Sequence, residues 1–549
     1  MPSEASVAVE PQAPAAAVSP WAPLGHPTFR ALWLAVLASH VGTWIHDVAA
    51  AWFMSERTGS PLLVAAVQSA TTLPVVVFAL IAGAFADTVD RRRYLIVIQL
   101  WMLVMATLLA VIALWGELNA WTLLGLTFAL GMGAAMAMPA QAAITSELVP
   151  RALLAPAVAL SSIGTNIARA VGPALGGLLV ARLGTGWAFS LDAVSYLGVL
   201  LVLVSWRRLT SAAALPPEPF GLALRSGLRY AARSNDVRSV LLKAAFFYVF
   251  ASALPAQLAI VVRGELGAGA GTYGLLLTCI GAGAVSGAIL LPRLRSRLGT
   301  DRVVVLATML YALTMLTVAQ VRQLPILGVA LVANGLAWIS VLSSLQAATH
   351  ISVPGWVRAR ALSLYIMVFS AGMAGGGLLW GAVAQRFGVS VSLTVAALAL
   401  VLAGAFASRF RLNPALTRDT APSHHWPAPP DAGATDPGPV LVTVEYRVAP
   451  ADLALFWPLI HQLGDSRRRD GAVQWGLVED PMEPGCVLEY FILGTWMEHL
   501  RQHERVTREE QALQERLRAL LQDGAAPRVR HFVTPQSPHP PHASRENTA

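Results

Sequence analysis

The stretch GAFADTVDRRRYL, residues 83–95, places two acids and three consecutive arginines between two long apolar runs. LLVAAVQSATTLPVVVFALIAGAFA precedes it at 62–86, and YLIVIQLWMLVMATLLAVIALW follows it at 94–115. A helix of about 20 apolar residues is long enough to cross a hydrocarbon layer of ~30 Å. The stretch therefore predicts a short charged turn between two membrane-spanning helices.

The composition of the whole chain points the same way. Of 549 residues, 55% are hydrophobic and 13% are charged, whereas soluble domains hold about 25% charged residues. The net charge of +8 comes largely from arginines between apolar runs, which favours membrane topology over nucleic-acid binding. Cys279 and Cys486 lie in unrelated contexts, which argues against a disulfide framework or a zinc site.

The apolar runs predict an all-α polytopic membrane protein with twelve transmembrane helices. The predicted spans are 30–54, 61–86, 94–115, 120–145, 152–182, 186–206, 239–262, 272–292, 302–320, 324–349, 361–385 and 389–409.

Arginines divide unequally between alternate loops of this arrangement. One set of loops holds 20 arginines and the other set holds 5. Because cytoplasmic loops carry an excess of Lys and Arg, the first set is assigned to the cytoplasm. Both termini are then predicted to be cytoplasmic.

The first six spans resemble the last six. Gly83 and Gly287 are 204 residues apart, and the same offset separates Gly172 from Gly376 and Gly184 from Gly388. Six spans return the chain to its starting side, so the halves are predicted to be parallel repeats. Such repeats build secondary transporters with a substrate cavity between the halves.

Two motifs resemble those of the major facilitator superfamily. The loop at 83–93 is similar to its signature G-x-x-x-D-x-x-x-R-R, matched by Gly83, Asp87, Arg91 and Arg92, although Thr88 and Asp90 replace an arginine and a glycine. GTNIARAVGPALGG at 164–177 resembles the fifth-helix motif of the antiporter branch. Its matching positions are Gly164, Gly172, Pro173, Gly176 and Gly177, and Ala168 replaces one glycine.

The resemblance covers about residues 25–412 and is closest to drug and siderophore exporters of the proton-antiporter type, including the enterobactin-exporter-like group. It implies a bacterial inner-membrane transporter that exports a small organic molecule against proton entry, without a cofactor or metal. No G-x-x-x-x-G-K-[ST] phosphate loop of an ATP pump is present. Facilitated diffusion or import on the same fold is a related alternative.

The family also implies roles for the two motifs. Asp87 is expected to brace the halves by interacting with the start of the eleventh span, near 360–363, where a helix N-terminus attracts a carboxylate. The loop could instead serve only as an orientation signal. The glycines and Pro173 allow close helix approach, which fits either plain packing or a role in coupling.

Charges inside the spans are costly and usually functional. Asp47 and Arg169 each lie 17 residues from the inner end of their span, so they are predicted to share a depth and to couple proton movement. A static buried pair, or an Asp47 near the outer surface, are the alternatives. Asp192 and Lys243 are expected to snorkel. Gln141, Asn166 and Asn334 are candidate polar groups of the cavity.

The remaining segments divide the chain further. They give a disordered tail at 1–24, a first half at 25–206, a cytoplasmic linker at 207–238, a second half at 239–412, a Pro-rich linker at 413–438, a cytoplasmic domain at 439–535 and a disordered tail at 536–549.

The domain at 439–535 alternates in the order β-α-β-β-α-β, which predicts a small α+β ferredoxin-like fold. It resembles the antibiotic-biosynthesis-monooxygenase-like domain, which implies pairing into a homodimer and leaves a rival reading, a membrane-anchored enzyme with a cofactor-free monooxygenase. His499 and His503 lie four residues apart on a predicted helix, but two ligands are too few for a metal and no third is evident.

Overall fold

The computed structural model describes residues 19–206, 220–412, 438–522 and 526–533, together with 419, 421, 423, 425 and 426. The side chains of 79–80, 83–88, 143, 146, 151 and 220–226 are outside this description. Most of the two expected tails and of the Pro-rich linker, and the first part of the 207–238 linker, therefore lie outside the described residues. The chain divides into two compact units, of which the first comprises 1–217, 244–344 and 366–409 and the second the rest.

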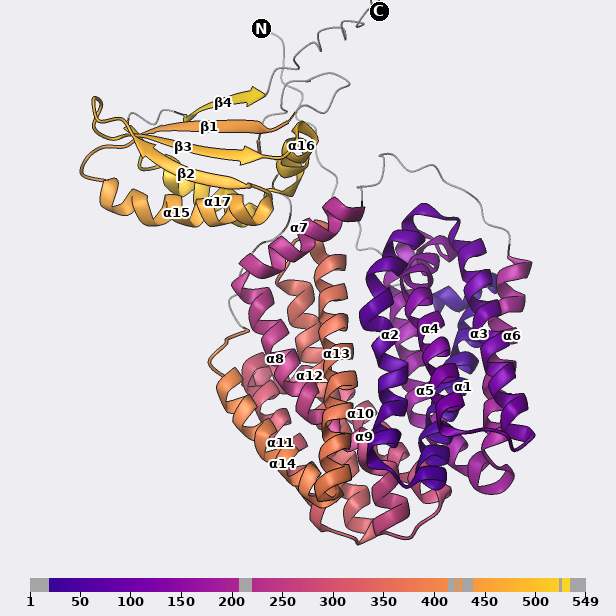
Figure 1. The fold of residues 1–549 in the computed structure, drawn as a ribbon. Helices are drawn as coiled ribbons and strands as arrows, with labels where there is room; N and C mark the ends of the chain where they lie inside the picture. The colour runs from indigo at the N-terminus through magenta and orange to yellow at the C-terminus, as the bar shows by residue number, and fades with distance from the viewer. Residues whose placement is uncertain are drawn as a thin grey trace, which may run out of the picture. The chain divides into compact units, whose positions relative to one another are not determined.

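Long helices make up the first 412 residues (Figure 1). The first half contains α1 (Pro27–Thr58), α2 (Pro61–Thr88), α3 (Arg91–Leu114), α4 (Ala120–Leu148), α5 (Leu154–Leu183) and α6 (Thr185–Ser205). Helix α7 (Phe220–Arg233) falls within the expected linker. The second half contains α8 (Asn235–Ala251), α9 (Ala253–Ile260), a π-helical turn (Val261–Glu265), α10 (Ala270–Leu298), α11 (Thr300–Gln320), α12 (Leu324–Ile351), α13 (Gly355–Phe387) and α14 (Val389–Ala407).

Eleven helices of the described residues are long and apolar enough to cross a membrane, counting α8, α9 and the π turn as one. Helix α1 is not among them, although it has 32 residues. His40, His46 and Asp47 lower its mean hydropathy. The structure therefore gives a multi-pass membrane protein, and the twelfth span depends on α1.

The helix boundaries repeat with the offset seen in the sequence. Helices α4 and α12 begin 204 residues apart, at Ala120 and Leu324, and α6 and α14 begin at Thr185 and Val389. Gly184 and Gly388 precede α6 and α14 with φ angles of 90° and 88°. Side chains rarely adopt this backbone conformation, so both turns depend on glycine. The two halves thus share one backbone plan.

The two halves contact each other at the end of the bundle where α1, α5 and α13 finish. Ser69 Oγ of α2 donates to the Ala374 carbonyl of α13 at 2.8 Å, and Arg263 Nη1 donates to the Ser55 carbonyl at 2.9 Å. Trp52 and Tyr273 stack with ring centroids 6.2 Å apart. This end of the bundle is the one whose loops hold five arginines in all.

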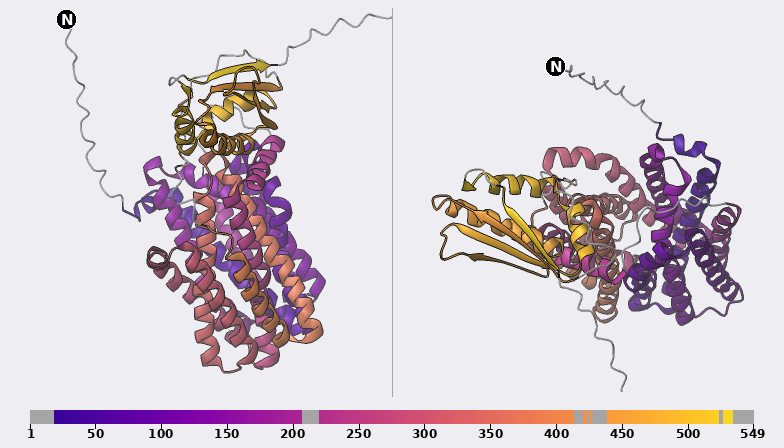
Figure 2. Two further views of the ribbon diagram at one scale, coloured as in Figure 1. Left: turned by 90° about the vertical axis from the view of Figure 1, so that its left-hand side faces the viewer. Right: turned by 90° about the horizontal axis from the view of Figure 1, so that it is seen from above.

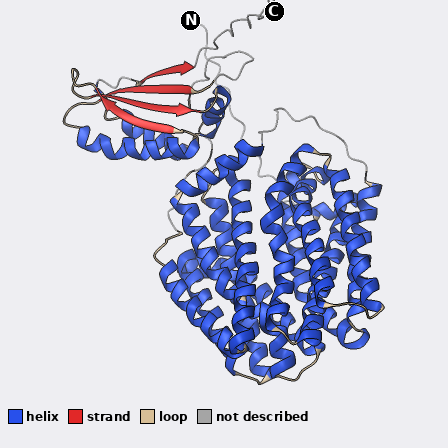
Figure 3. Cartoon of the chain, viewed as in Figure 1, coloured by secondary structure: helices blue, strands red, loops and turns tan. Residues whose placement is uncertain are grey.

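The C-terminal domain is a four-stranded antiparallel sheet with helices on one face (Figures 2 and 3). Its elements are β1 (Val440–Arg447), α15 (Leu453–Asp470), β2 (Gln474–Glu479), β3 (Cys486–Leu493), α16 (Trp496–Arg505), α17 (Arg508–Arg518) and β4 (Arg528–Val533). The strand order is β2-β3-β1-β4. Alternate residues of β1 and β3 are buried, as period-two patterning requires.

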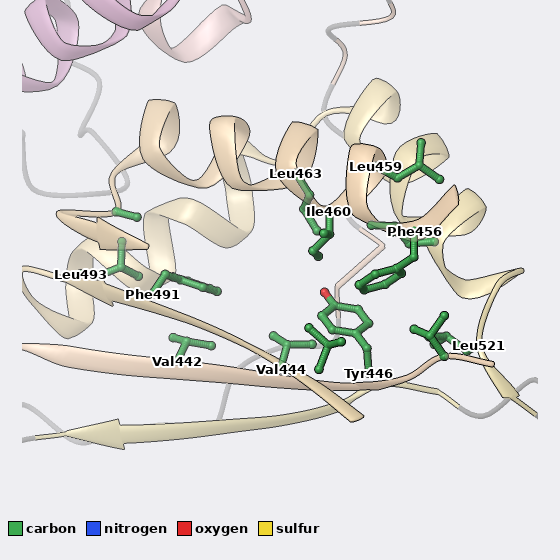
Figure 4. Packing of buried hydrophobic residues seen from close by; sticks show 14 of the residues in the cluster. Val442, Val444, Tyr446, Phe456, Leu459, Ile460, Leu463, Phe491, Leu493 and Leu521 are labelled. Atoms are coloured by element: carbon green, nitrogen blue, oxygen red, sulfur yellow. The ribbon is translucent and has the colours of Figure 1, made fainter. Parts of the chain in front are cut away.

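The core of this domain lies between the sheet and α15 (Figure 4). Among its buried charged residues is Glu489, which is fully buried on β3. Its carboxylate accepts from the Tyr446 hydroxyl at 2.9 Å, from Trp475 Nε1 at 2.9 Å and from Arg467 Nε at 3.3 Å. Burial, followed by the charge of Glu489, raises the pKa of Tyr446 well above its ordinary value. The phenol therefore stays protonated and donates.

Candidate functional site

A cavity of about 330 Å³ lies inside the first half, between α1, α4, α5 and α6. Apolar side chains form most of its wall, and the polar ones are spread over three helices. The polar side chains are His40, Gln141, Thr145, Ser161 and Thr165. On α1 the wall runs from Phe29 to His40, so the cavity lies toward the end of the bundle where α1 begins. This is the opposite end from the contacts between the halves.

A cluster of ionisable side chains lies deeper along α1. His46 Nδ1 is 3.4 Å from Asp192 Oδ2 of α6, and the two residues are only 4% and 1% exposed. Neither Asp192 oxygen has an aligned hydrogen-bond donor among the described residues. On the other side of the ring, His46 Nε2 is 3.4 Å from the Thr127 hydroxyl. A buried pair with unsatisfied atoms is costly in a membrane and indicates a functional group.

Asp47 adjoins this pair and is only half-buried. On α1 it lies five residues before Trp52, whose ring stacks on that of Tyr273 of the second half. Asp47 therefore lies where the two halves meet, next to a buried pair but with access to its surroundings. A carboxylate in this position is able to bind and release a proton.

The predicted relation between Asp47 and Arg169 is not found. Both residues are described, yet no side-chain hydrogen bond or ion pair among the described residues involves either of them. Depth along a helix was the basis of the prediction, and it does not determine which way a side chain points. Asp192 and Lys243 were expected to snorkel, but they are 1% and 4% exposed. Asp192 lies instead against His46 of α1.

The candidate polar residues occupy three different environments. Gln141 lines the cavity. Asn166 Nδ2 donates to the Ser162 carbonyl of its own helix at 2.9 Å. Asn334 is buried in the second half, where its Nδ2 donates to the Thr314 hydroxyl at 2.8 Å. Of the three, only Gln141 is placed to touch a bound molecule in the cavity.

The charged turn connects several helices of the first half. Arg91 pairs with Glu147 of α4 at 3.0 Å, and Arg92 donates to the carbonyls of Leu203 and Val204 at the end of α6. A cation at a helix C-terminus is favourable. Asp90 caps α3 by accepting from the Arg93 backbone at 2.9 Å, which explains an acid at this position. The side chains of Gly83 and Asp87, and the expected contact of Asp87 with 360–363, lie outside the described part.

The glycines of α5 make close contacts on two sides. A Cβ atom at Gly172 would lie 2.4 Å from Trp44 Cβ, and one at Gly176 would lie 3.1 Å from Ile45 Cα, both on α1. A Cβ at Gly177 would lie 2.7 Å from Gly274 Cα of α10. Gly164 faces Trp33 beside the cavity, and the Pro173 carbonyl lies against Gly274. The motif therefore packs α5 on its own half and on the other half at once.

The sequence did not single out His46. His46 directly precedes Asp47 in the sequence, but its side chain points toward α6. Its one signal was that Asp192 also interrupts an apolar span, so that α1 and α6 each supply an ionisable group. Ionisable residues within two apolar spans were therefore the evidence that the sequence offered for a pair between His46 and Asp192.

Relatives of known class resemble this chain over most of their length. An uncharacterized MFS-type transporter of Bacillus subtilis, YfiS, is 25% identical over 389 residues, covering 67% of this chain and 89% of the relative. The enterobactin exporter EntS of Salmonella typhi is 25% identical over 391 residues, covering 69% of this chain and 91% of its own length.

Solved structures show the same fold for the helical part. A bacterial homolog of the human lysosomal transporter Spinster, in an inward-facing and unoccupied conformation, matches with a TM-score of 0.56 at 17% identity, over 70% of this chain and 97% of that one. A POT family transporter matches with a TM-score of 0.59 at 10% identity, over 71% and 96%. The model of the transmembrane secretion effector family matches residues 18–539. The chain therefore belongs to the transmembrane secretion effector family of MFS-type membrane transporters.

Proposed function

We propose that this protein exports a small organic molecule from a bacterial cell across the inner membrane, driven by proton entry through alternating access. The observation that carries the proposal is the half-buried Asp47 beside the buried His46–Asp192 pair. Burying an ionisable group inside a membrane span costs free energy, and such groups usually have a function such as proton transfer. The similarity to an enterobactin exporter supports export of a siderophore-sized or drug-like molecule.

The position of the cavity supports a transport cycle in ordered steps. The cavity lies toward one end of the bundle, and the contacts between the halves lie at the other. A substrate entering from the cytoplasm would bind in the cavity, and protonation of Asp47 from outside would favour the return. A proton shifts this equilibrium only if its affinity differs between the two orientations. Asp47 lies near Trp52 on α1, which stacks on Tyr273 of the other half, so a movement of the halves would change the surroundings of the carboxylate.

Transport by purified protein in vesicles tests the function directly. We expect at least one compound from a panel of siderophores and lipophilic drugs to accumulate against its gradient when a pH gradient is imposed. A protonophore should abolish this accumulation. Accumulation that is equal with and without the pH gradient for every compound would contradict proton coupling. Consumption of an organic compound by the full chain in detergent would instead favour the monooxygenase alternative.

The proposed topology has twelve spans with both termini in the cytoplasm. It counts α1 with the eleven apolar helices and places the loops with 20 arginines inside. Reporter fusions at residues 58 and 264 should then indicate an external location, and a fusion after 412 an internal one. An external C-terminus would show that the span count is wrong.

We also propose that the C-terminal domain is ferredoxin-like, supported by its antiparallel strand order β2-β3-β1-β4 and by the placement of α15 between β1 and β2. The family match extends through this domain to residue 539, which supports a role within the transporter. Pairing of two copies through the domain stays a prediction.

A further inference from the structure

Three imidazoles meet between α16 and β4 of the C-terminal domain. His499, His503 and His531 each offer a ring nitrogen, and these atoms all lie within 4.8 Å of one another. The ring centroids of His499 and His503 are 4.7 Å apart, and so are those of His499 and His531. Residues 506–527 separate the helix from the strand in the sequence. The three histidines are therefore brought together by the tertiary fold.

The backbone explains why these rings converge. His499 and His503 are four residues apart on α16 and share one face of the helix. His531 pairs with Val442 across β4 and β1, and opposed residues of two strands share a face of the sheet. Val442 points into the core of the domain (Figure 4). His531 is therefore directed to the side of the sheet that carries the helices.

The ring of His499, at the centre of the cluster, lacks hydrogen-bond partners among the described residues. His499 is 1% exposed, and neither of its ring nitrogens has a hydrogen-bond partner among the described residues. Gln502, one helical turn further on, is equally buried, and its Oε1 is also unpartnered there. Buried polar atoms are nearly always hydrogen-bonded or ligated. Two unpartnered side chains at one place indicate that a ligand is missing.

Aromatic rings lie against the histidine cluster. The ring of Trp496 lies 5.1 Å from that of His499, and the ring of Trp426 lies 4.8 Å from that of His503. The nearby positive charge of Arg467 is partly compensated, because Arg467 pairs with the buried Glu489.

We propose that His499, His503 and His531 form a binding site for a divalent first-row transition metal of the zinc class, with a fourth coordination position open. Three histidines with an open position are a known zinc arrangement, with Zn–N distances of about 2.0–2.1 Å. Tetrahedral geometry then places ligand nitrogens about 3.3 Å apart, so rotations closing the largest separation by about 1.5 Å complete the site. Imidazole ligands favour zinc, copper, nickel or iron over magnesium and calcium.

The oxygen of Gln502 fits a supporting role. A histidine that ligates a metal usually donates its other N–H to an oxygen, which fixes its tautomer. Gln502 adjoins His499 and has an acceptor to spare. The bound metal would join α16 to the edge strand β4. The three histidines belong to the second unit, whereas the cavity and Asp47 belong to the first, so metal binding can be tested independently of transport.

Metal analysis of the full-length protein in detergent tests the proposal. The affinity tag must contain no histidine, and the protein is stripped with a chelator, loaded with Zn²⁺ and dialysed. We expect close to one Zn²⁺ per chain, together with a rise in thermal midpoint on loading, because a ligand that binds only the folded state stabilises it. Mg²⁺ should produce neither effect. Co²⁺ should bind in place of Zn²⁺ and give the visible absorption of a tetrahedral site.

Two variants and two controls locate the metal. His503→Gln and His531→Gln replace the two less buried ligands and should each weaken Zn²⁺ binding by about tenfold or more, the effect typical of disturbing a metal site. His461→Gln changes another histidine of the domain, exposed on α15, and should bind as the parent does. A His539→Gln/His542→Gln double variant tests the histidines of the C-terminal tail. The proposal fails if the parent retains no Zn²⁺, or if binding is lost in the controls and kept in His503→Gln and His531→Gln.

Discussion

Replacing Asp47 by asparagine should abolish proton-driven accumulation of substrate while leaving the protein folded. The amide resembles the protonated acid in shape and cannot release a proton, so substrate binding and downhill movement should continue. We expect uphill accumulation to fall by about tenfold or more, in line with coupling free energies of ~1–3 kcal/mol. Transport in vesicles and thermal stability should be measured on the same preparation.

The matched controls separate coupling from structure. Glu117→Gln neutralises an exposed acid in a loop and should transport normally. Asp192→Asn removes one member of the buried pair, and loss of such a partner costs ~3–5 kcal/mol when the pair is charged. Asp192→Asn should therefore lose thermal stability, whereas Asp47→Asn should not. A folded Asp47→Asn protein that accumulates substrate at the parental rate would refute the role of Asp47.

Replacing Gly274 by alanine should open the end of the bundle at which the halves meet. A Cβ atom there would lie 2.6 Å from the Pro173 carbonyl oxygen and 2.7 Å from Gly177 Cα. Both contacts are backbone atoms of the other half, which are unable to rotate away. Overpacking of this kind costs ~1–3 kcal/mol, which corresponds to a shift of about 5- to 150-fold between two orientations of similar energy.

Gly271 provides a control on the same helix. Its added Cβ would meet only Ala181 Cβ, at 3.9 Å, which is an ordinary contact. A single cysteine at Ser55, in a background with Cys279 and Cys486 replaced by serine, reports the opening through an impermeant thiol reagent. Labelling should rise in Gly274→Ala and stay low in Gly271→Ala. Equal labelling and equal transport in the two variants would show that the close contact at Gly274 is not required to keep this end of the bundle closed.

The helices of this protein were largely readable from the sequence. The expected spans 61–86 and 324–349 correspond to α2 (Pro61–Thr88) and α12 (Leu324–Ile351). Apolar runs, charged turns and paired glycines are local signals, and each sets a boundary by itself. The first strand of the order β-α-β-β-α-β expected over 439–535 also agrees with β1, because alternation is local too.

The contacts between elements were not readable in this way. Helices α1 and α6 show little separation of polar and apolar residues onto opposite faces, so periodicity does not reveal which face is turned toward a neighbour. Matched depth suggested Arg169 as the partner of Asp47, whereas rotation about the helix axes instead brought His46 to Asp192. The third histidine was missed for the same reason. His531 is 28 residues from His503, and only the pairing of β4 with β1 brings it near.

Under the proposed function, the wall of the cavity also limits how well the protein discriminates between substrates. Apolar side chains such as Leu32, Val36 and Leu37 form most of that wall. Against such a surface, one methylene more or less changes binding by only ~1–3 kcal/mol, and an isostere bearing an extra hydroxyl is rejected weakly. Strict recognition needs buried polar groups that a wrong molecule leaves unpaired. The size and hydrophobicity of a molecule would then decide whether it is transported, and several chemically unrelated compounds would be substrates of the same protein.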